Sequence, residues 1–326
     1  MRAVLCKQHG PPESLVVEEV ESPKPGARQV LIGVHACGVN FPDTLIIEGK
    51  YQFQPDMPFS PGGEVAGEVL AVGEEVTEYQ TGDRVIAMTG WGGFAEEVLC
   101  DVPQVMPLPE SMDYITGSAF SMTYGTSYHA LVQRAEIQPG ETLLVLGASG
   151  GVGLAAVELG KVLGARVIAA AGSDEKLEVA REHGADELIN YNTEKLKERV
   201  KELTGEQGAD VIYDPVGGDA FDQAIRCINW NGRLLVVGFA SGRIPELRVN
   251  LALLKGCQVV GVFWGAFAGR EPQTNARNFK ELFTMHAEGK IRPHVSAKYP
   301  LEQAADALND LLQRKVTGKV VLTTGR

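Results

Sequence analysis

The chain has 326 residues, of which 44% are hydrophobic and 22% charged, and its formal net charge is −12. This composition predicts a globular protein, and the negative charge argues against nucleic acid or an anionic membrane surface as the main partner. The N-terminus lacks the apolar segment of a signal peptide, and no run of about 18 apolar residues occurs. Because the five cysteines also show no paired spacing, we expect a cytoplasmic protein.

The first 120 residues are typical of a β-rich domain with short connections. Turns rich in proline and glycine, such as residues 22–26 and 60–63, separate short segments that favour strands. The expected strands cover residues 2–7, 15–20, 29–37, 63–72, 84–88 and 95–100.

From residue 115 onward, short apolar strands alternate with helical segments. The expected strands cover residues 137–146, 166–171, 187–190, 211–214, 233–238 and 258–263. The helices expected between them include residues 176–183, 193–203 and 218–228. This alternation predicts an α/β fold with a doubly wound parallel sheet. Residues 275–326 then add two amphipathic helices and closing strands.

A glycine-rich turn follows the apolar strand that ends at Leu146. Four glycines fall within residues 147–153, and a helical pattern begins directly after them. Strand, tight turn and helix in this order place backbone N–H groups where they bind a pyrophosphate, and glycine allows the phosphate to approach closely. We therefore predict dinucleotide contacts from Ser149, Gly150, Gly151 and Val152.

The next strand indicates which dinucleotide binds. It ends in Ala171, Gly172 and Ser173, without the acidic residue that usually binds the ribose 2′-OH of NAD. Ser173 and Lys176 suit a 2′-phosphate, and the acids between them suit the first turn of a helix, so NADP(H) is the expected cofactor. Other residues at the carboxyl ends of later strands are expected to line the same cleft: Gly238, Phe239, Ala240, Phe263 and Trp264.

Four segments carry a family resemblance: residues 37–43 (CGVNFPD), 61–67 (PGGEVAG), 147–153 and 211–218 (VIYDPVGG). With them, the whole chain resembles the zinc-free quinone oxidoreductase (ζ-crystallin-like) branch of the medium-chain dehydrogenase/reductase superfamily. The resemblance implies a GroES-like catalytic domain formed by residues 1–122 and 264–326. It also implies an NADP(H)-binding Rossmann domain at residues 123–263.

The resemblance also implies that no metal is bound. Zinc-dependent relatives have cysteine at the position of Asn40 and a Gly-His-Glu motif where this chain has Gly62-Gly63-Glu64. The lobe that holds their structural zinc is missing, since residues 90–94 run directly into the next expected strand. Without a Lewis acid to activate an alcohol, reduction of electrophilic acceptors is favoured.

Three residues are candidates for the chemistry. The Asn40 amide suits a hydrogen bond to a carbonyl oxygen or the nicotinamide ribose, and Asp43 suits orientation of Asn40 or proton relay. Tyr51 matches a loop tyrosine near the substrate in zinc-free enoyl reductases, either as proton donor or as a wall of the site. The resemblance further implies cofactor contacts from Thr126, Tyr191, Gly217 and Lys319. A helix cap is the alternative for Thr126, and core packing for Tyr191.

The expected reaction is hydride transfer from NADPH to quinones or α,β-unsaturated carbonyl compounds. One alternative is a 2-enoyl-CoA reductase, favoured by Tyr51 and by nine basic against four acidic residues between positions 243 and 298. Another is a non-catalytic NADPH-binding protein. The apolar strand at residues 258–263, at the end of the sheet, predicts a homodimer formed by strand pairing.

Overall fold

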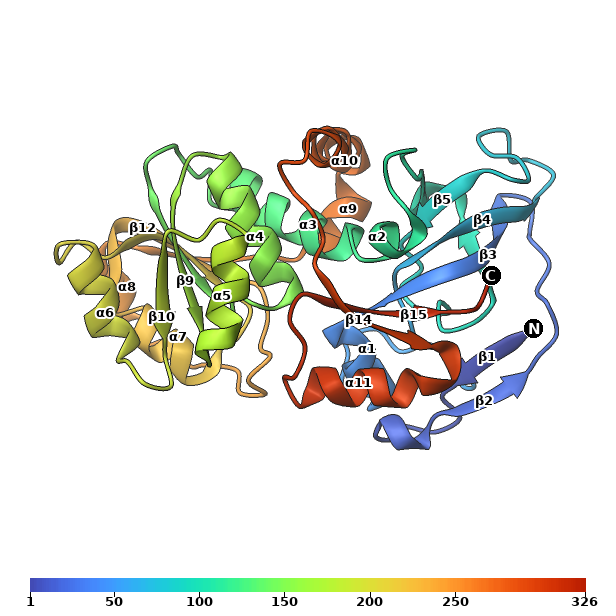
Figure 1. Cartoon of the computed structure of the whole chain (residues 1–326), viewed down its shortest axis with the longest axis horizontal. Helices are drawn as coiled ribbons and strands as arrows, with labels where there is room; N and C mark the ends of the chain where they lie inside the picture. The colour runs from blue at the N-terminus through green and yellow to red at the C-terminus, as the bar shows by residue number, and fades with distance from the viewer. The chain divides into compact units, whose positions relative to one another are not determined.

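The computed structural model describes residues 1–326 as two compact units (Figure 1). Unit 1 comprises Met1–Met122 and Val295–Arg326, and unit 2 comprises Thr123–His294. The chain therefore passes between the units twice. None of its helices is both long and apolar enough to cross a membrane.

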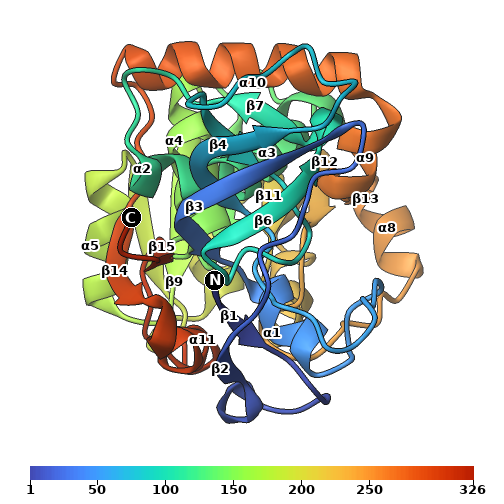
Figure 2. The ribbon, with the colours of Figure 1, turned by 90° about the vertical axis from the view of Figure 1, so that its right-hand side faces the viewer.

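Unit 1 is built around a seven-stranded sheet with the order β14-β15-β3-β4-β5-β7, and β6 also pairs with β3. Figure 2 shows β3 between β4 and β6. The strands are β3 (Gln29–Val39), β4 (Val65–Val72), β5 (Arg84–Ala87), β6 (Glu97–Asp101), β7 (Val105–Pro107), β14 (Val295–Pro300) and β15 (Lys319–Thr323). A separate hairpin joins β1 (Arg2–Leu5) to β2 (Val16–Glu19). The helices are α1 (Phe41–Ile47), α2 (Tyr114–Ser118) and α11 (Ala304–Leu312), with short 3-10 turns η1 (Pro12–Ser14), η2 (Val102–Gln104) and η4 (Leu301–Gln303).

Unit 2 contains a parallel six-stranded sheet whose strands are connected by helices. The strand order is β10-β9-β8-β11-β12-β13. The strands are β8 (Thr142–Leu146), β9 (Arg166–Ala171), β10 (Glu187–Asn190), β11 (Ala209–Asp214), β12 (Ile228–Val236) and β13 (Gln258–Gly261). Counted within the unit, this is the order 3-2-1-4-5-6 of the dinucleotide-binding fold, so the predicted doubly wound sheet is confirmed. The helices are α3 (Ser121–Tyr128), α4 (Gly151–Val162), α5 (Asp174–Glu182), α6 (Leu196–Leu203), α7 (Gly218–Ala224), α8 (Asn250–Lys255), α9 (Trp264–Arg270) and α10 (Pro272–Ala287), with a π-helical turn η3 (His129–Arg134) after α3.

Residues 264–294 lie in unit 2, whereas the sequence placed them with the catalytic domain. The reason is the packing of Trp264, whose ring lies against Gly125 of α3, where a Cβ would come within 2.6 Å of the indole. The Trp264 indole N–H donates to Asn275 at 3.0 Å, and its ring lies 6.1 Å from that of Phe279. These apolar contacts hold α9 and α10 to α3. The first boundary, between residues 122 and 123, is where the sequence placed it.

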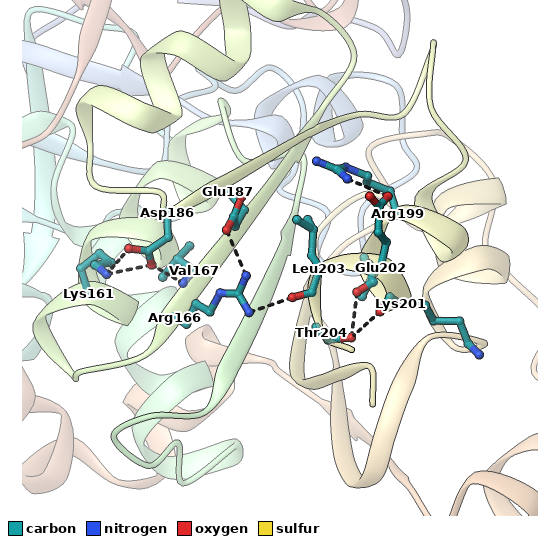
Figure 3. Close-up of polar contacts among 11 residues, drawn as sticks. Lys161, Arg166, Val167, Asp186, Glu187, Arg199, Lys201, Glu202, Leu203 and Thr204 are labelled. Atoms are coloured by element: carbon teal, nitrogen blue, oxygen red, sulfur yellow. Dashed lines mark hydrogen bonds and ion pairs between the residues drawn. The ribbon is translucent and has the colours of Figure 1, made fainter. Parts of the chain in front are cut away.

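Ion pairs lie at the N-terminal ends of β9 and β10 (Figure 3). Asp186 accepts hydrogen bonds from Lys161 at 2.7 and 2.8 Å and from the backbone N–H of Val167 at 2.7 Å. Arg166 pairs with Glu187 at 3.0 Å. Such half-exposed pairs contribute little to stability, and acids balance the bases here, so this surface offers no binding site of one charge.

A buried carboxylate in α4 holds together segments of unit 2 that are distant in sequence. Glu158 accepts a hydrogen bond from the Tyr124 hydroxyl at 2.6 Å and another from the backbone N–H of Arg292 at 3.1 Å. Its second oxygen lies 2.7 Å from Nδ1 of His183. Tyr124 and Arg292 stand next to the two places where the chain enters and leaves unit 2, so Glu158 anchors both to the helix that follows the glycine turn.

Candidate active site

A buried polar cluster forms where β3 ends and β4 and β15 begin. The antiparallel register pairs Val320 with Val39 and Cys37 with Val65, which places Lys319 beside Asn40 and Glu64 beside Gly38. The cluster consists of Asn40, Asp43, Glu64 and Lys319, all less than 9% exposed. Charged groups are buried only where partners compensate them, so the members of this cluster must bind one another.

Asn40 is held by hydrogen bonds on both sides of its amide. Its Nδ2 donates to the carbonyl oxygen of Gly38 and to Oε2 of Glu64, both at 3.1 Å, and its Oδ1 accepts from Nζ of Lys319 at 2.6 Å. Its backbone N–H donates to Asp43 at 2.7 Å, in the capping box that begins α1. The structure thus brings together the predicted residues Asn40, Asp43 and Lys319.

Glu64 is the residue of this cluster to which the sequence assigned no role. Its Oε2 lies 3.1 Å from Nζ of Lys319, and its Oε1 accepts from the backbone N–H of Met122 at 2.9 Å. Space for the pair depends on Gly38, since a Cβ there would lie 3.0 Å from the carboxylate and 2.0 Å from the carbonyl oxygen of Ser118. The sequence signal that could have identified it is an acid between two glycines and the first residues of a buried strand.

Asp43 and Tyr51 share an unusual electrostatic environment. Burial raises the pKa of Asp43 to about 7, although the backbone N–H groups of Asn40 and Gly62 and the charge of Lys319 act in the opposite direction. Burial and the nearby Asp43 carboxylate raise the pKa of Tyr51 above its usual value. The Tyr51 phenol is therefore protonated at neutral pH, as a proton donor must be.

In unit 2 the glycine turn has the geometry that a pyrophosphate requires. Gly147 has φ +57°, α4 begins at Gly151, and Gly150 is its N-cap. At Gly153 a Cβ would lie 2.3 Å from the carbonyl oxygen of Gly147, so the third glycine allows close packing of helix against turn. Ser149, Gly150, Gly151 and Val152 thus form the N-terminal end of a 12-residue helix, and these residues fit a bound dinucleotide.

The residues predicted to contact the adenosine ribose and its 2′-phosphate lie at the C-terminal end of β9. Ser173 is the N-cap of α5 and accepts a hydrogen bond from the backbone N–H of Lys176 at 3.4 Å. Tyr191 lies near Gly172, where a Cβ would be 3.5 Å from its ring. Asn192 donates to the carbonyl oxygen of Gly172 at 2.7 Å, which joins the loop after β10 to this site.

The loops after β11 and β12 are joined to each other. Asp214 accepts from the backbone N–H of Gly217 at 2.8 Å, and the backbone N–H of Gly238 donates to the carbonyl oxygen of Asp214 at 3.3 Å. Ala240 donates to the carbonyl oxygen of Pro215 at 3.0 Å, and Phe239 lies between these two bonded positions. All four predicted residues of these loops therefore stand at the carboxyl edge of the sheet.

Three further residues predicted to contact the cofactor, Thr126, Phe263 and Trp264, lie in or next to helices of unit 2. Thr126 lies inside α3 and not at its start, so it is not the helix cap considered from the sequence. Phe263 follows β13 and is exposed, whereas Trp264 is buried against α3. The cofactor contacts of all three stay predictions.

No three His, Cys, Asp or Glu side chains gather in the way a metal ion requires. At the cluster in unit 1, the Lys319 ammonium contacts Asn40 and Glu64, the two residues that stand in or beside the zinc-ligand positions of the zinc-dependent relatives. Activity without metal stays a prediction.

Comparison with known proteins matches both parts of the chain to family models. Residues 26–110 match the alcohol dehydrogenase GroES-like domain, and residues 151–281 match the zinc-binding dehydrogenase model. A quinone oxidoreductase-like protein 2 homolog of Nematostella vectensis is 44% identical over 99% of this chain and 89% of its own length. The quinone oxidoreductase of Homo sapiens is 34% identical over 99% of this chain and 97% of its own length.

Solved structures agree with these sequence matches. Escherichia coli quinone oxidoreductase complexed with NADPH superposes with a TM-score of 0.93 at 30% identity, covering 99% of this chain and 100% of that one. Quinone oxidoreductase of Pseudomonas syringae pv. tomato DC3000 superposes with a TM-score of 0.92 at 32% identity, covering 99% of both chains. The likeness therefore extends over both units.

Proposed function

The chain belongs to the quinone oxidoreductase family of the medium-chain dehydrogenase/reductase superfamily, and from this premise we propose that it reduces quinones or α,β-unsaturated carbonyl compounds with NADPH and without zinc. The observation that carries the proposal is the buried cluster of Asn40, Glu64 and Lys319. It supplies a fixed positive charge and hydrogen-bonding groups where zinc-dependent relatives have metal ligands. Such groups suit an acceptor that develops negative charge on oxygen.

The cofactor is NADP(H). The Escherichia coli relative is complexed with NADPH, and the residues of this chain fit the same group. The glycine turn at Gly147–Gly153 would hold the pyrophosphate, while Ser173 and Lys176 would bind the 2′-phosphate. Tyr191 would lie against the adenosine. When bound, the nicotinamide supplies a hydride for transfer to the acceptor.

The remaining chemistry falls to side chains of unit 1. The polar cluster would lie near the oxygen on which charge develops, and Tyr51 would give a proton to the enolate carbon of a reduced enone. Asp43, whose carboxyl group is buried beside Asn40, would keep that amide in place and could pass a proton to Tyr51. These roles are consistent with the protonated state of the Tyr51 phenol at neutral pH.

One assay separates the candidate functions. NADPH oxidation is followed with 1,4-quinones, with short enones, with crotonyl-CoA and with buffer alone. Turnover of quinones or enones supports the proposal, and turnover of crotonyl-CoA alone would favour the 2-enoyl-CoA reductase. Cofactor binding without any turnover would favour the non-catalytic NADPH-binding protein. The basic segment gives the thioester only limited support, because Arg243 is paired with Asp219 and Asp222.

We expect NADPH to be preferred over NADH by at least about tenfold in kcat/KM, which corresponds to about 1.4 kcal/mol. Lys176→Ala should remove most of this preference, because it deletes a positive charge beside the predicted 2′-phosphate position. Steady-state kinetics with both cofactors test this, with Lys24→Ala in an exposed loop of unit 1 as the control. An equal loss with NADPH and NADH would show that Lys176 does not bind the 2′-phosphate.

We further propose a homodimer. Strand β13 pairs only with β12, and it carries the exposed Val259 and is followed by the exposed Phe263; further exposed apolar side chains occur in residues 230–254: Trp230, Ile244, Val249, Leu253 and Leu254. Pairing of β13 with its copy would satisfy the free edge and cover these side chains. Light scattering should give about 70 kDa, twice the 35.0 kDa chain mass, and Val259→Lys should shift the protein to monomer. A wild-type species of 35 kDa would contradict the proposal.

A further inference from the structure

We propose that Lys319 is the residue that stabilises the negative charge on the substrate oxygen, and that Glu64 and Asn40 are positioning residues for it. The inference rests on the proposed function. It names the group of the same site that stabilises the negative charge on the substrate oxygen. From the sequence, we expected Asn40 to contact a carbonyl oxygen or the nicotinamide ribose, and Lys319 to contact the cofactor.

The hydrogen bonds of Asn40 exclude it as the donor to substrate. An amide has two N–H donors, and both are used, one by Gly38 and one by Glu64. The amide cannot simply turn over, because its oxygen would then face the Glu64 carboxylate and the Gly38 carbonyl, while its nitrogen would face the Lys319 ammonium. Asn40 therefore has no N–H left for a ligand.

Lys319 has one donor to spare. An ammonium has three N–H groups, and its two hydrogen bonds go to Oδ1 of Asn40 and Oε2 of Glu64. The side chain is only 5% exposed, so little water competes for the third N–H and its interaction with an anion is strong. A preorganised donor of this kind, at a site shielded from water, is what stabilises a developing oxyanion.

Glu64 fixes the position of the Lys319 ammonium. Its Oε1 is anchored by the backbone N–H of Met122, and its Oε2 bonds both Lys319 and Asn40. Gly38 leaves the room for these contacts, because a Cβ there would lie 3.1 Å from Nζ of Lys319. The ammonium is therefore held from two sides, and its flexible stem does not have to be ordered when substrate arrives.

An enone is reduced by a hydride transfer followed by a proton transfer. Hydride adds to the β-carbon, the electron pair of the C=C bond moves toward the carbonyl, and the oxygen becomes an enolate. Lys319 donates a hydrogen bond to this oxygen and keeps its proton. The α-carbon then takes a proton from the Tyr51 phenol, and the phenolate recovers one from solvent. The substrate gains two electrons and two hydrogens, and NADPH is oxidised to NADP⁺.

The test uses Lys319→Met in the full chain, with Lys298→Met as its control, since Lys298 is exposed on β14, the strand next to β15. Two quantities are measured: the single-turnover rate with a short enone at saturating NADPH, and the NADPH dissociation constant from nicotinamide fluorescence. We expect Lys319→Met to slow the turnover by about 100-fold or more, while the dissociation constant changes less than about threefold. Lys298→Met should change neither.

Glu64→Gln supplies a readout that a purely structural role would not give. The amide has a single acceptor oxygen, so it can accept from the backbone N–H of Met122 or from Lys319 but not from both, and it removes the charge that pairs with Lys319. We expect a KM near that of wild type, an NADPH dissociation constant near that of wild type, and a kcat lower by about tenfold or more, because the ammonium is no longer held in place for the substrate oxygen. A kcat like that of wild type, or a loss that appears equally in kcat and in NADPH affinity, would contradict the positioning role of Glu64.

If Lys319→Met fails to fold because Glu64 is left unpaired, the double variant Lys319→Met/Glu64→Gln removes both charges and keeps the test open. A single-turnover rate close to wild type in either folded variant would overturn the inference, as would a loss confined to NADPH affinity. Loss of rate in Asn40→Ala without loss in Lys319→Met would make Asn40 the donor instead. A wild-type chain that binds NADPH and reduces no acceptor would overturn the proposed function itself.

Discussion

Gly153→Ala is expected to weaken NADPH binding by at least about 100-fold and to destabilise unit 2. The added Cβ would lie 2.3 Å from the carbonyl oxygen of Gly147 and 2.9 Å from Cα of Ala148. Both are backbone atoms, so no side chain can rotate away, and either the turn or the start of α4 must move. Because the N–H groups that would hold the pyrophosphate belong to this same turn, a displaced turn cannot bind it.

Two other glycines make this prediction specific. At Gly150 a Cβ would meet only the carbonyl oxygen of Gly147, at 3.5 Å, and φ is −78°, which alanine adopts freely. Gly150→Ala should therefore fold as well as wild type and yet bind NADPH about tenfold more weakly, since its methyl group would stand at the phosphate position. Gly269→Ala, in open space in α9, should change neither property.

Fluorescence titration gives the NADPH dissociation constant of each of the three variants, and urea unfolding gives its free energy of unfolding. If Gly153→Ala bound NADPH as wild type does, the tight packing of α4 on the turn would not be needed for the cofactor site. If Gly150→Ala bound normally, the phosphate would not approach the backbone at that residue.

The features that could be predicted from the sequence are those whose causes lie within a few neighbouring residues. The glycine turn, the acids Asp174 and Glu175 in the first turn of α5, and the alternation of strands with helices each depend on a short segment, and each is found in the structure. Side-chain periodicity decides such elements locally, whatever the rest of the chain does.

The features that escaped prediction depend on residues far apart in the chain. Glu64 and Lys319 are separated by 255 positions, and they meet only because β4 and β15 flank β3. Nothing near Glu64 in the sequence indicates its partner. The same holds for Trp264, whose place in unit 2 depends on the space above Gly125. The resemblance predicted Lys319 as a cofactor contact, but only the hydrogen bonds show that its ammonium has a donor left and that the Asn40 amide does not.

The carboxyl group of Asp43 should make the stability of the protein depend strongly on pH. Its pKa is about 7 in the folded chain and close to 4 in an unfolded one, because burial disfavours the charged form. The folded state therefore holds this proton more tightly. The stability that the protonated carboxyl provides is complete below about pH 4 and is lost as the pH rises through 4 to 7. The full shift corresponds to on the order of 4 kcal/mol.

Asp43→Asn isolates this effect, because the amide cannot ionise and its oxygen can still accept from the backbone N–H of Asn40. Urea unfolding of both proteins at about pH 5 and pH 8 gives four free energies of unfolding. On going to the higher pH, wild type should lose about 3 kcal/mol more than the variant does, while all other titrating groups cancel in the comparison. Equal pH dependence of the two proteins would mean that Asp43 is already ionised at pH 5 in the folded state. The carboxylate would then be compensated by Lys319 and the N–H groups around it, and Asp43 could not exchange a proton with Tyr51 at neutral pH.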